Sequence, residues 1–200
     1  MKKKGRFIIG MIIILIVIFV YAHISKTHCI YDKKIDASTY KTTSFYLNQT
    51  VSQEFKSLEK TLDGIQVKCK LTGNPENVEV KFRLVDNEAG KEVANGEVEG
   101  NTFKDSKFYN FSFDTIQNSL NKNYTFELQT YNENSENHID FCFTDGRQKN
   151  TSLVIGEEKM ENTLVLKTVT KRFDIETFLI LGVFVIYIIV FIKFLYRMFK

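Results

Sequence analysis

Two uncharged hydrophobic runs near the ends of the 200-residue chain constrain its fold more than any other feature. Residues 7–22 are FIIGMIIILIVIFVYA, and residues 177–192 are TFLILGVFVIYIIVFI. As a helix, each run would be about 24 Å long, and adjoining apolar residues and lysine side chains that reach the lipid headgroups would extend it towards the bilayer core of about 30 Å. We therefore expect transmembrane helices at residues 7–24 and 177–193.

The basic residues near these runs predict their orientation. They lie at the terminal side of each run: Lys2, Lys3, Lys4, Arg6, Lys193, Arg197 and Lys200. By the positive-inside rule, the tails at residues 1–6 and 194–200 are cytoplasmic and the middle of the chain is extracytoplasmic. The expected location is the cell membrane, as a two-pass protein. The alternative for the first run is a signal peptide cleaved after Ala22, but the length of the run and the lack of a helix breaker favour an anchor.

The exported middle has a mixed, slightly acidic surface. All 24 acidic residues of the chain lie between Asp32 and Glu176, and 20 of its 27 basic residues lie between the two hydrophobic runs. This balance gives no basic surface for nucleic acid, so we expect no nucleic-acid partner. Of the three cysteines, Cys69 falls on the apolar face of a predicted strand, which favours a buried thiol over a disulfide with Cys142.

Alternating polar and apolar residues predict the fold of this middle part. Residues 25–44 are polar and show no clear period, which indicates a stalk, whereas residues 45–170 alternate with period two, as half-buried strands do. Phe82, Phe111, Phe126 and Phe141 fall on the apolar faces of four such strands. Because each strand has one apolar face, two sheets must pack together. We expect an all-β fold, an antiparallel jelly-roll-like β-sandwich flanked by one N-terminal and one C-terminal transmembrane helix.

Short motifs follow one another along this part in a recognisable order. They are VSQEF at 51–55, LDGIQV at 62–67, FYNFSF at 108–113, NYTFEL at 123–128, NHIDF at 137–141 and NTLVL at 162–166. In this order they resemble the exported, carbohydrate-binding-like jelly-roll modules of bacterial membrane glycosyltransferases and surface-polysaccharide biosynthesis proteins. The resemblance implies an accessory or glycan-binding role, with a membrane glycosyltransferase or a cell-surface glycan as partner. The chain departs from that pattern because it has two predicted spans, no catalytic half and no tryptophan.

Motifs for enzyme chemistry are missing from the sequence, which has no nucleophile elbow, zinc motif or phosphate loop. We therefore expect no enzyme activity, no metal and no cofactor. Some residues are candidates by type alone: His23, His28 and Cys29 for zinc, Asp86 and Glu88 for calcium, and Glu97, Glu99 and Asp105 for glycoside cleavage. The first set lacks a fourth ligand, and the spacing of the second suits a hairpin turn better.

Four tyrosines lie outside the predicted strand core and are candidates for stacking against sugar rings: Tyr31, Tyr40, Tyr46 and Tyr131. The alternative is that they pack at the edge of the core or at the membrane interface. The sequence thus predicts a non-catalytic, membrane-anchored sandwich that is an accessory or glycan-binding subunit in cell-envelope polysaccharide assembly. The alternative function is a membrane adaptor that binds another envelope protein through its sandwich.

Overall fold

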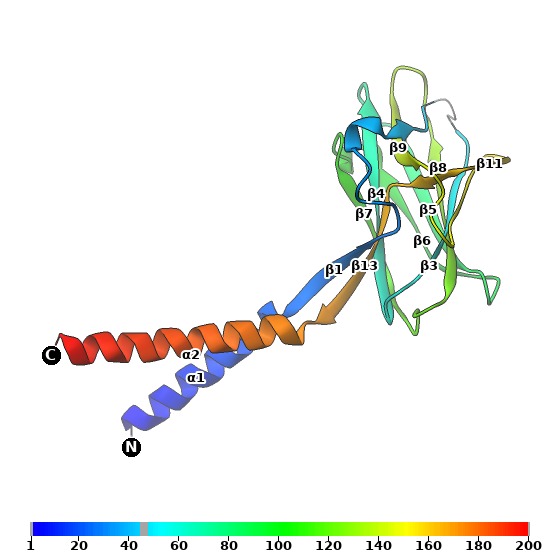
Figure 1. Cartoon of the computed structure of the whole chain (residues 1–200). Helices are drawn as coiled ribbons and strands as arrows, with labels where there is room; N and C mark the ends of the chain where they lie inside the picture. Colours follow the sequence, from blue (N-terminus) through cyan, green and yellow to red (C-terminus); the bar gives the residue numbers. More distant parts are fainter. Residues whose placement is uncertain (1, 45–47, 200) are drawn as a thin grey trace. The chain divides into compact units, whose positions relative to one another are not determined.

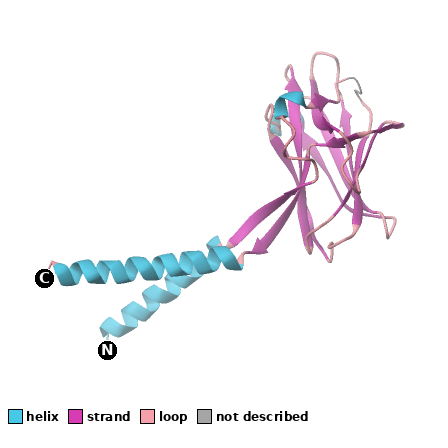
Figure 2. Ribbon diagram, in the orientation of Figure 1, coloured by secondary structure: helices cyan, strands magenta, loops and turns pink. Residues whose placement is uncertain are grey.

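The computed structural model describes residues 2–44 and 48–199, in two compact units. One unit is residues 27–170, and the other combines the two terminal segments, residues 1–26 and 171–200. The first unit is built mainly of strands and the second mainly of helices (Figures 1 and 2).

The strands form two antiparallel sheets. Within the described residues, one sheet has the order β11-β10-β3-β8-β5-β6, and the other has the order β1-β13-β4-β9-β12, with β7 on β4 and β2 on β9. The strands of the first sheet are β3 (Val51–Lys56), β5 (Glu79–Asp86), β6 (Lys91–Glu99), β8 (Asn123–Tyr131), β10 (Ser152–Ile155) and β11 (Glu158–Met160). Those of the second are β1 (His23–Cys29), β2 (Lys41–Thr42), β4 (Thr61–Thr72), β7 (Phe108–Gln117), β9 (His138–Asp145), β12 (Asn162–Leu164) and β13 (Leu166–Phe173). The predicted antiparallel β-sandwich is confirmed.

The core lies between the two sheets, where the alternating pattern places it. Phe82, Phe111, Phe126 and Phe141 are all buried, as expected. The ring of Phe82 lies 5.3 Å from that of Phe111 and 6.0 Å from that of Phe126, measured between centroids, so strands of both sheets contribute to one aromatic cluster. These buried rings stabilise the packing of the sheets.

A buried glutamine also joins the two sheets. Gln53 of β3 is fully buried, and its Oε1 accepts a hydrogen bond of 2.8 Å from the backbone N–H of Leu164 in β12. Its Nε2 donates to the carbonyl oxygens of Glu54, at 2.8 Å, and Ser152, at 3.1 Å. Every polar atom of the side chain is thereby paired, which a polar group in a core requires.

The segment expected to be a stalk, residues 25–44, contains regular structure. It includes most of β1, the 3-10 turn η1 (Ala37–Thr39) and β2, and residues from Thr27 onward belong to the same compact unit as the sandwich. β2 pairs with β9, where Lys41 lies opposite Phe143. The hydrophobic pattern misses these elements because β1 and β2 carry few apolar side chains of their own.

The second unit contains α1 (Lys2–Tyr21) and α2 (Ile175–Met198). The backbone N–H of Asp174 donates to the carbonyl of Ala22, at 2.8 Å, and its carboxylate pairs with Lys26 at 2.6 Å and accepts from the backbone N–H of Thr177, capping α2. The end of α1 is thus bonded to the start of α2.

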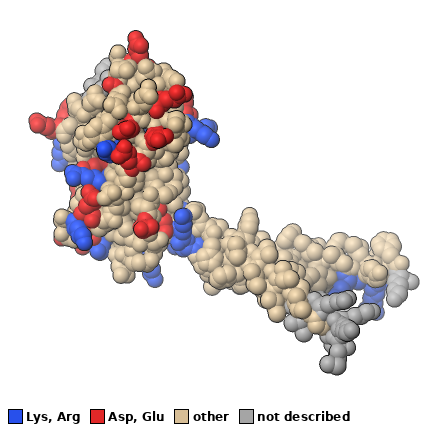
Figure 3. All heavy atoms as spheres, turned by 180° about the vertical axis from the view of Figure 1, so that it is seen from behind, with Lys and Arg blue, Asp and Glu red and all other residues tan. Residues whose placement is uncertain are grey.

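By length and composition, α2 is suited to cross a membrane; in the described residues it is the one helix that is. The apolar part of α1, Ile9–Tyr21, is shorter, so the N-terminal span stays a prediction. In Figure 3 the described part of the helices carries few charged side chains, whereas acidic and basic side chains are scattered over the sandwich.

The three cysteines are free. Cys69 faces the core and is fully buried, as the sequence favours. Its cross-strand partner on β9 is Phe141, so Cys142, the next residue, points to the opposite face of the sheet, and the alternative of a Cys69–Cys142 disulfide is wrong. Burial raises the pKa of the Cys142 thiol to about 11, which disfavours its reactive thiolate form at neutral pH.

Candidate functional site

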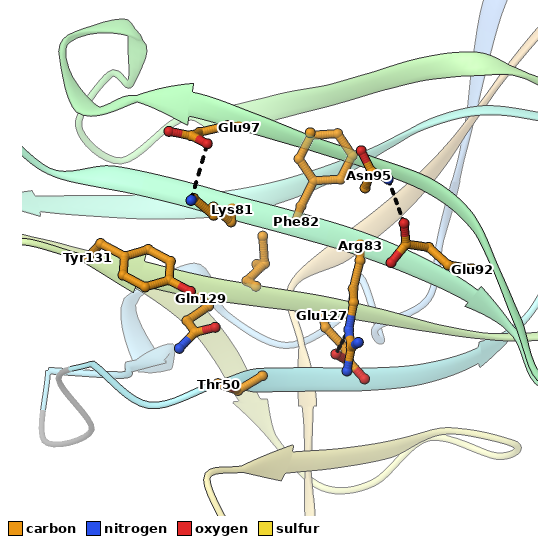
Figure 4. A pocket seen from close by; sticks show the side chains of 12 residues that line it. Thr50, Lys81, Phe82, Arg83, Glu92, Asn95, Glu97, Glu127, Gln129 and Tyr131 are labelled. Carbon is orange, nitrogen blue, oxygen red and sulfur yellow. Dashed lines mark hydrogen bonds and ion pairs between the residues drawn. The ribbon is translucent and has the colours of Figure 1, made fainter.

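A groove of about 720 Å³ runs along the outer face of the six-stranded sheet (Figure 4). Its lining comes mainly from β5, β6 and β8: Thr50, Lys81, Phe82, Arg83, Glu92, Asn95, Gly96, Glu97, Glu127, Leu128, Gln129 and Tyr131. The volume lies within the range of small-molecule sites in proteins, and most of the lining side chains are polar.

Strand alternation explains which side chains reach the groove. Phe82 and Leu128 point into the core, so their neighbours along each strand point outward. The pairing register then aligns the outward residues in rows across the sheet. In one row Lys81 lies between Gln129 and Glu97. In the next row Arg83 lies between Glu127 and Asn95.

Ion pairs order the charged side chains of these rows. The Nζ of Lys81 lies 3.3 Å from a carboxylate oxygen of Glu97, and the Nε of Arg83 donates to Glu127. The hydrogen bond that Arg83 donates to Glu127, and then the negative charge of that carboxylate, raise the pKa of the Arg83 guanidinium above its usual value. Both basic side chains of the groove are therefore already paired with carboxylates.

Tyr131 provides an aromatic face at one end of the groove. The ammonium of Lys81 lies 5.1 Å from the centroid of its ring, a cation–π contact that holds the ring in place. Gln129 lies beside it on the same strand and contributes an amide that both donates and accepts hydrogen bonds (Figure 4). An aromatic face together with amide, carboxylate and guanidinium groups can bind a ligand that has both apolar C–H faces and hydroxyl groups.

The other predicted stacking tyrosines lie elsewhere. Tyr31 and Tyr40 pack edge to face, with centroids 6.2 Å apart, and the ammonium of Lys68 lies 5.1 Å from the Tyr40 ring. Neither residue lines the groove, because they contact the outward side of β4 and β7 in the other sheet. Tyr46 lies outside the described residues. Tyr131 is thus the predicted stacking residue that the structure places in a groove.

The residues considered for calcium form a turn. Asp86 Oδ1 accepts from the backbone N–H groups of Glu88, at 3.0 Å, and Ala89, at 3.1 Å, and its Oδ2 accepts from Lys122, at 3.1 Å. This carboxylate closes the β5–β6 hairpin, as the spacing in the sequence predicts, and it also pairs with Lys122.

The remaining candidate carboxylates are dispersed. Glu97 lines the groove, Glu99 lies outward at the end of β6, and Asp105 accepts a hydrogen bond of 2.9 Å from the backbone N–H of Leu71. Among the residues that the structure describes, no three His, Cys, Asp or Glu side chains are grouped as metal ligands. His28 and Cys29 line a separate small cavity of about 120 Å³.

Sequence reasoning misses most of the groove. Lys81, Arg83, Glu127 and Gln129 are polar residues at outward positions of ordinary strands, and nothing in their spacing distinguishes them. Only the register, which places β5 between β8 and β6, brings them together. Tyr131 is the groove residue that the sequence identifies as a stacking candidate, because it is a large aromatic residue beyond the end of the apolar pattern, at an outward position of β8.

Comparison by sequence finds no matching protein family and no matching curated protein. Solved structures that the chain resembles include the cysteine protease and lectin-like domains of Cwp84, a surface-layer-associated protein of Clostridium difficile, with 12% identity and a TM-score of 0.42 over 68% of this chain and 36% of that one. Another is the carbohydrate-binding module TmCBM61 in complex with β-1,4-galactotriose, with 14% identity and a TM-score of 0.29; the match covers 65% of this chain and 87% of that one. A third is VP2 of infectious bursal disease virus, with 9% identity and a TM-score of 0.33; the match covers 73% of this chain and 36% of that one. The chain thus spans about a third of the length of the Cwp84 and VP2 chains.

Proposed function

We propose that the chain is a membrane-anchored glycan-binding protein whose ligand lies in the groove of β5, β6 and β8. The observation that carries the proposal is the position of Tyr131, a ring oriented by Lys81 at one end of a polar groove of about 720 Å³. A sugar ring can place its C–H face on the tyrosine, while its hydroxyl groups bond to Gln129 and Asn95.

The groove is proposed to bind and not to react. Its carboxylates Glu97 and Glu127 are each held by a basic side chain, Lys81 and Arg83. Glycoside cleavage needs two carboxyl groups that act on either side of the scissile bond, whereas both of these carboxylates are already engaged in ion pairs within the protein. This pairing supports a non-catalytic role.

The proposed setting is the bacterial cell envelope, where a jelly-roll-like sandwich would serve polysaccharide assembly as an accessory subunit. The apolar helix α2 supports anchoring, and the basic residues at both chain ends support cytoplasmic termini with an extracytoplasmic sandwich. Anchoring beside a membrane glycosyltransferase or a cell-surface glycan would raise the local concentration of the domain, so that modest affinity suffices.

A second candidate function is an adaptor for another envelope protein. It is supported by β6, a nine-residue strand at the end of the six-stranded sheet that presents an open edge. An open edge can accept a strand from a partner. The charged residues Lys91, Glu92, Glu97 and Glu99 along this strand oppose such pairing, so glycan binding is the preferred proposal.

The binding experiment uses the full-length protein in detergent on a panel of polysaccharides, followed by titration of the best ligand. Tyr131→Ala and Gln129→Ala are each expected to weaken binding about tenfold, because stacking and hydrogen bonds to a ligand contribute on the order of 1 kcal/mol or more. Gln66→Ala is the matched control, since Gln66 lies on β4 of the other sheet and is not part of the groove.

Two results would count against the proposal. A folded protein that binds no glycan in the panel would refute glycan binding itself. Binding that survives both groove substitutions as well as it survives Gln66→Ala would place the ligand on another surface.

The proposed topology is tested separately with a membrane-impermeant thiol reagent in intact cells. In a Cys29→Ser background, in which Cys69 and Cys142 remain buried, Asn95→Cys should react, and Gly5→Cys and Arg197→Cys should not. Labelling at either terminal position without permeabilisation would contradict cytoplasmic termini.

A further inference from the structure

The outer face around the groove carries an excess of negative charge. At outward positions of β5, β6 and β8 there are five acidic side chains and two basic ones: Glu79, Glu92, Glu97, Glu99, Glu127, Lys81 and Arg83. The two basic groups are ion-paired with Glu97 and Glu127, and Arg83 also interacts electrostatically with Glu92, so the acidic side chains of this face outnumber the basic ones by three. A ligand that enters the groove therefore meets a net negative surface.

One row of this face shows the excess clearly. Glu79 and Glu99 are direct cross-strand partners on β5 and β6, and Tyr131 lies opposite Glu79 on β8. Like charges directly opposite each other on a sheet destabilise it, so this arrangement costs the folded protein stability. A positively charged ligand beside the two carboxylates would relieve that repulsion.

The protein's own Lys81 shows how the groove holds an ammonium group. Its Nζ lies 3.3 Å from Glu97 and 5.1 Å from the ring centroid of Tyr131, so a single cation is bound by a carboxylate and an aromatic face together. The side chains of Lys81 and Glu97 are about half exposed, at 50% and 52%, so an incoming amine can reach the same carboxylate. The same groups that orient Lys81 would recognise an amine on a ligand.

We propose that the groove selects glycans that carry protonated amino groups, such as chains of hexosamine that are not N-acetylated. The inference rests on the proposed function and names the ligand class. An acidic glycan would instead meet this excess of carboxylates and two basic groups that are already neutralised, while a neutral glycan would gain nothing from the charge of the groove.

The test compares two oligosaccharides with the same backbone, a β-1,4-linked glucosamine hexamer and its fully N-acetylated counterpart. Both are titrated into the full-length protein in detergent, at pH 5.5 and low salt, where the amino groups of the first hexamer are protonated. The amine-bearing hexamer is expected to bind about tenfold more tightly, and the preference should shrink as salt is added, because charge pairs this exposed are screened.

Two substitutions connect the preference to this face of the sheet, one at Glu97 in the groove and one at Glu79, which lies opposite Tyr131. Glu97→Gln and Glu79→Gln are each expected to reduce the ratio of the affinities for the amine-bearing and acetylated hexamers about threefold. Glu158→Gln is the control, because Glu158 is an exposed carboxylate on β11, at the opposite edge of the same sheet. An effect of Glu158→Gln equal to that of Glu97→Gln and Glu79→Gln would overturn the inference.

The outcomes separate this inference from the function on which it rests. Equal binding of the two hexamers, or binding only of neutral or acidic polysaccharides, would overturn amine selection and leave glycan binding intact. Failure to bind the hexamers and every other polysaccharide would refute both.

Discussion

Replacing Gly96 by alanine would test how tightly the core packs against β6, the strand at one side of the groove. A Cβ atom at this position would lie 2.5 Å from Cε1 and 2.7 Å from Cζ of Phe82, well inside van der Waals contact. The Phe82 ring cannot simply move away, because it lies 5.3 Å from the ring of Phe111 and 6.0 Å from that of Phe126. Overpacking of this kind costs about 1–3 kcal/mol, a substantial share of the 5–15 kcal/mol typical of a folded domain.

The assay is unfolding of the full-length protein in detergent, followed by circular dichroism of the sandwich. For a unit of this size, each kcal/mol shifts the midpoint temperature by roughly 3 °C, so Gly96→Ala should lower it by about 3–9 °C. Phe82→Leu leaves room for the new methyl group, so the two substitutions together should be less harmful than their sum by at least about 1 kcal/mol. A neutral Gly96→Ala, or strict additivity with Phe82→Leu, would refute this account of the packing.

Two further predictions concern buried polar groups. Gln53→Leu should destabilise the sandwich by about 2–3 kcal/mol in denaturant titrations, because it leaves the buried N–H of Leu164 without a partner. The control Gln66→Leu, on the outer face, should change stability by less than about 0.5 kcal/mol. Equal effects of the two substitutions would contradict the bridging role of Gln53. Burial raises the pKa of Asp86, but hydrogen bonds from the Ala89 backbone and Lys122 outweigh it, so the pKa lies below its usual value. A carboxyl group whose pKa is lowered by folding stabilises the protein at neutral pH, and this stability is lost as the pH falls from about 4 through the folded-state pKa. Asp86→Asn should therefore lose less stability than the unmodified protein over this pH range. The same dependence of unfolding free energy on pH in both proteins would contradict the assignment.

The sequence predicts the sandwich well because burial imposes a period of two on strands with one apolar face. Phe82, Phe111, Phe126 and Phe141 are placed correctly by that pattern alone. The pattern fails for β1 and β2, whose polar side chains lie mostly outside the core and whose structure depends on pairing with other strands.

The groove illustrates a different limit. Its residues come from three strands, and which strand lies beside which is a long-range property that no local pattern encodes. Tyr31 and Tyr40 are tyrosines outside the predicted strand core, as Tyr131 is, yet they pack against each other and do not line the groove. Composition therefore identifies candidate rings, and only the register shows which of them lies beside hydrogen-bonding partners.

A glycan bound on the face formed by β5, β6 and β8 would shield these strands from solvent, and footprinting with a photoactivated carbene measures that protection. The full-length protein is labelled with and without the best-bound oligosaccharide, and protection is mapped by peptide. Protection is expected in residues 79–86, 91–99 and 123–131, strongest around Lys81, Glu97 and Tyr131, with none around Tyr31 and Tyr40. Protection confined to the Tyr31 and Tyr40 region, or its absence from all three groove strands while the glycan is bound, would contradict binding on this face.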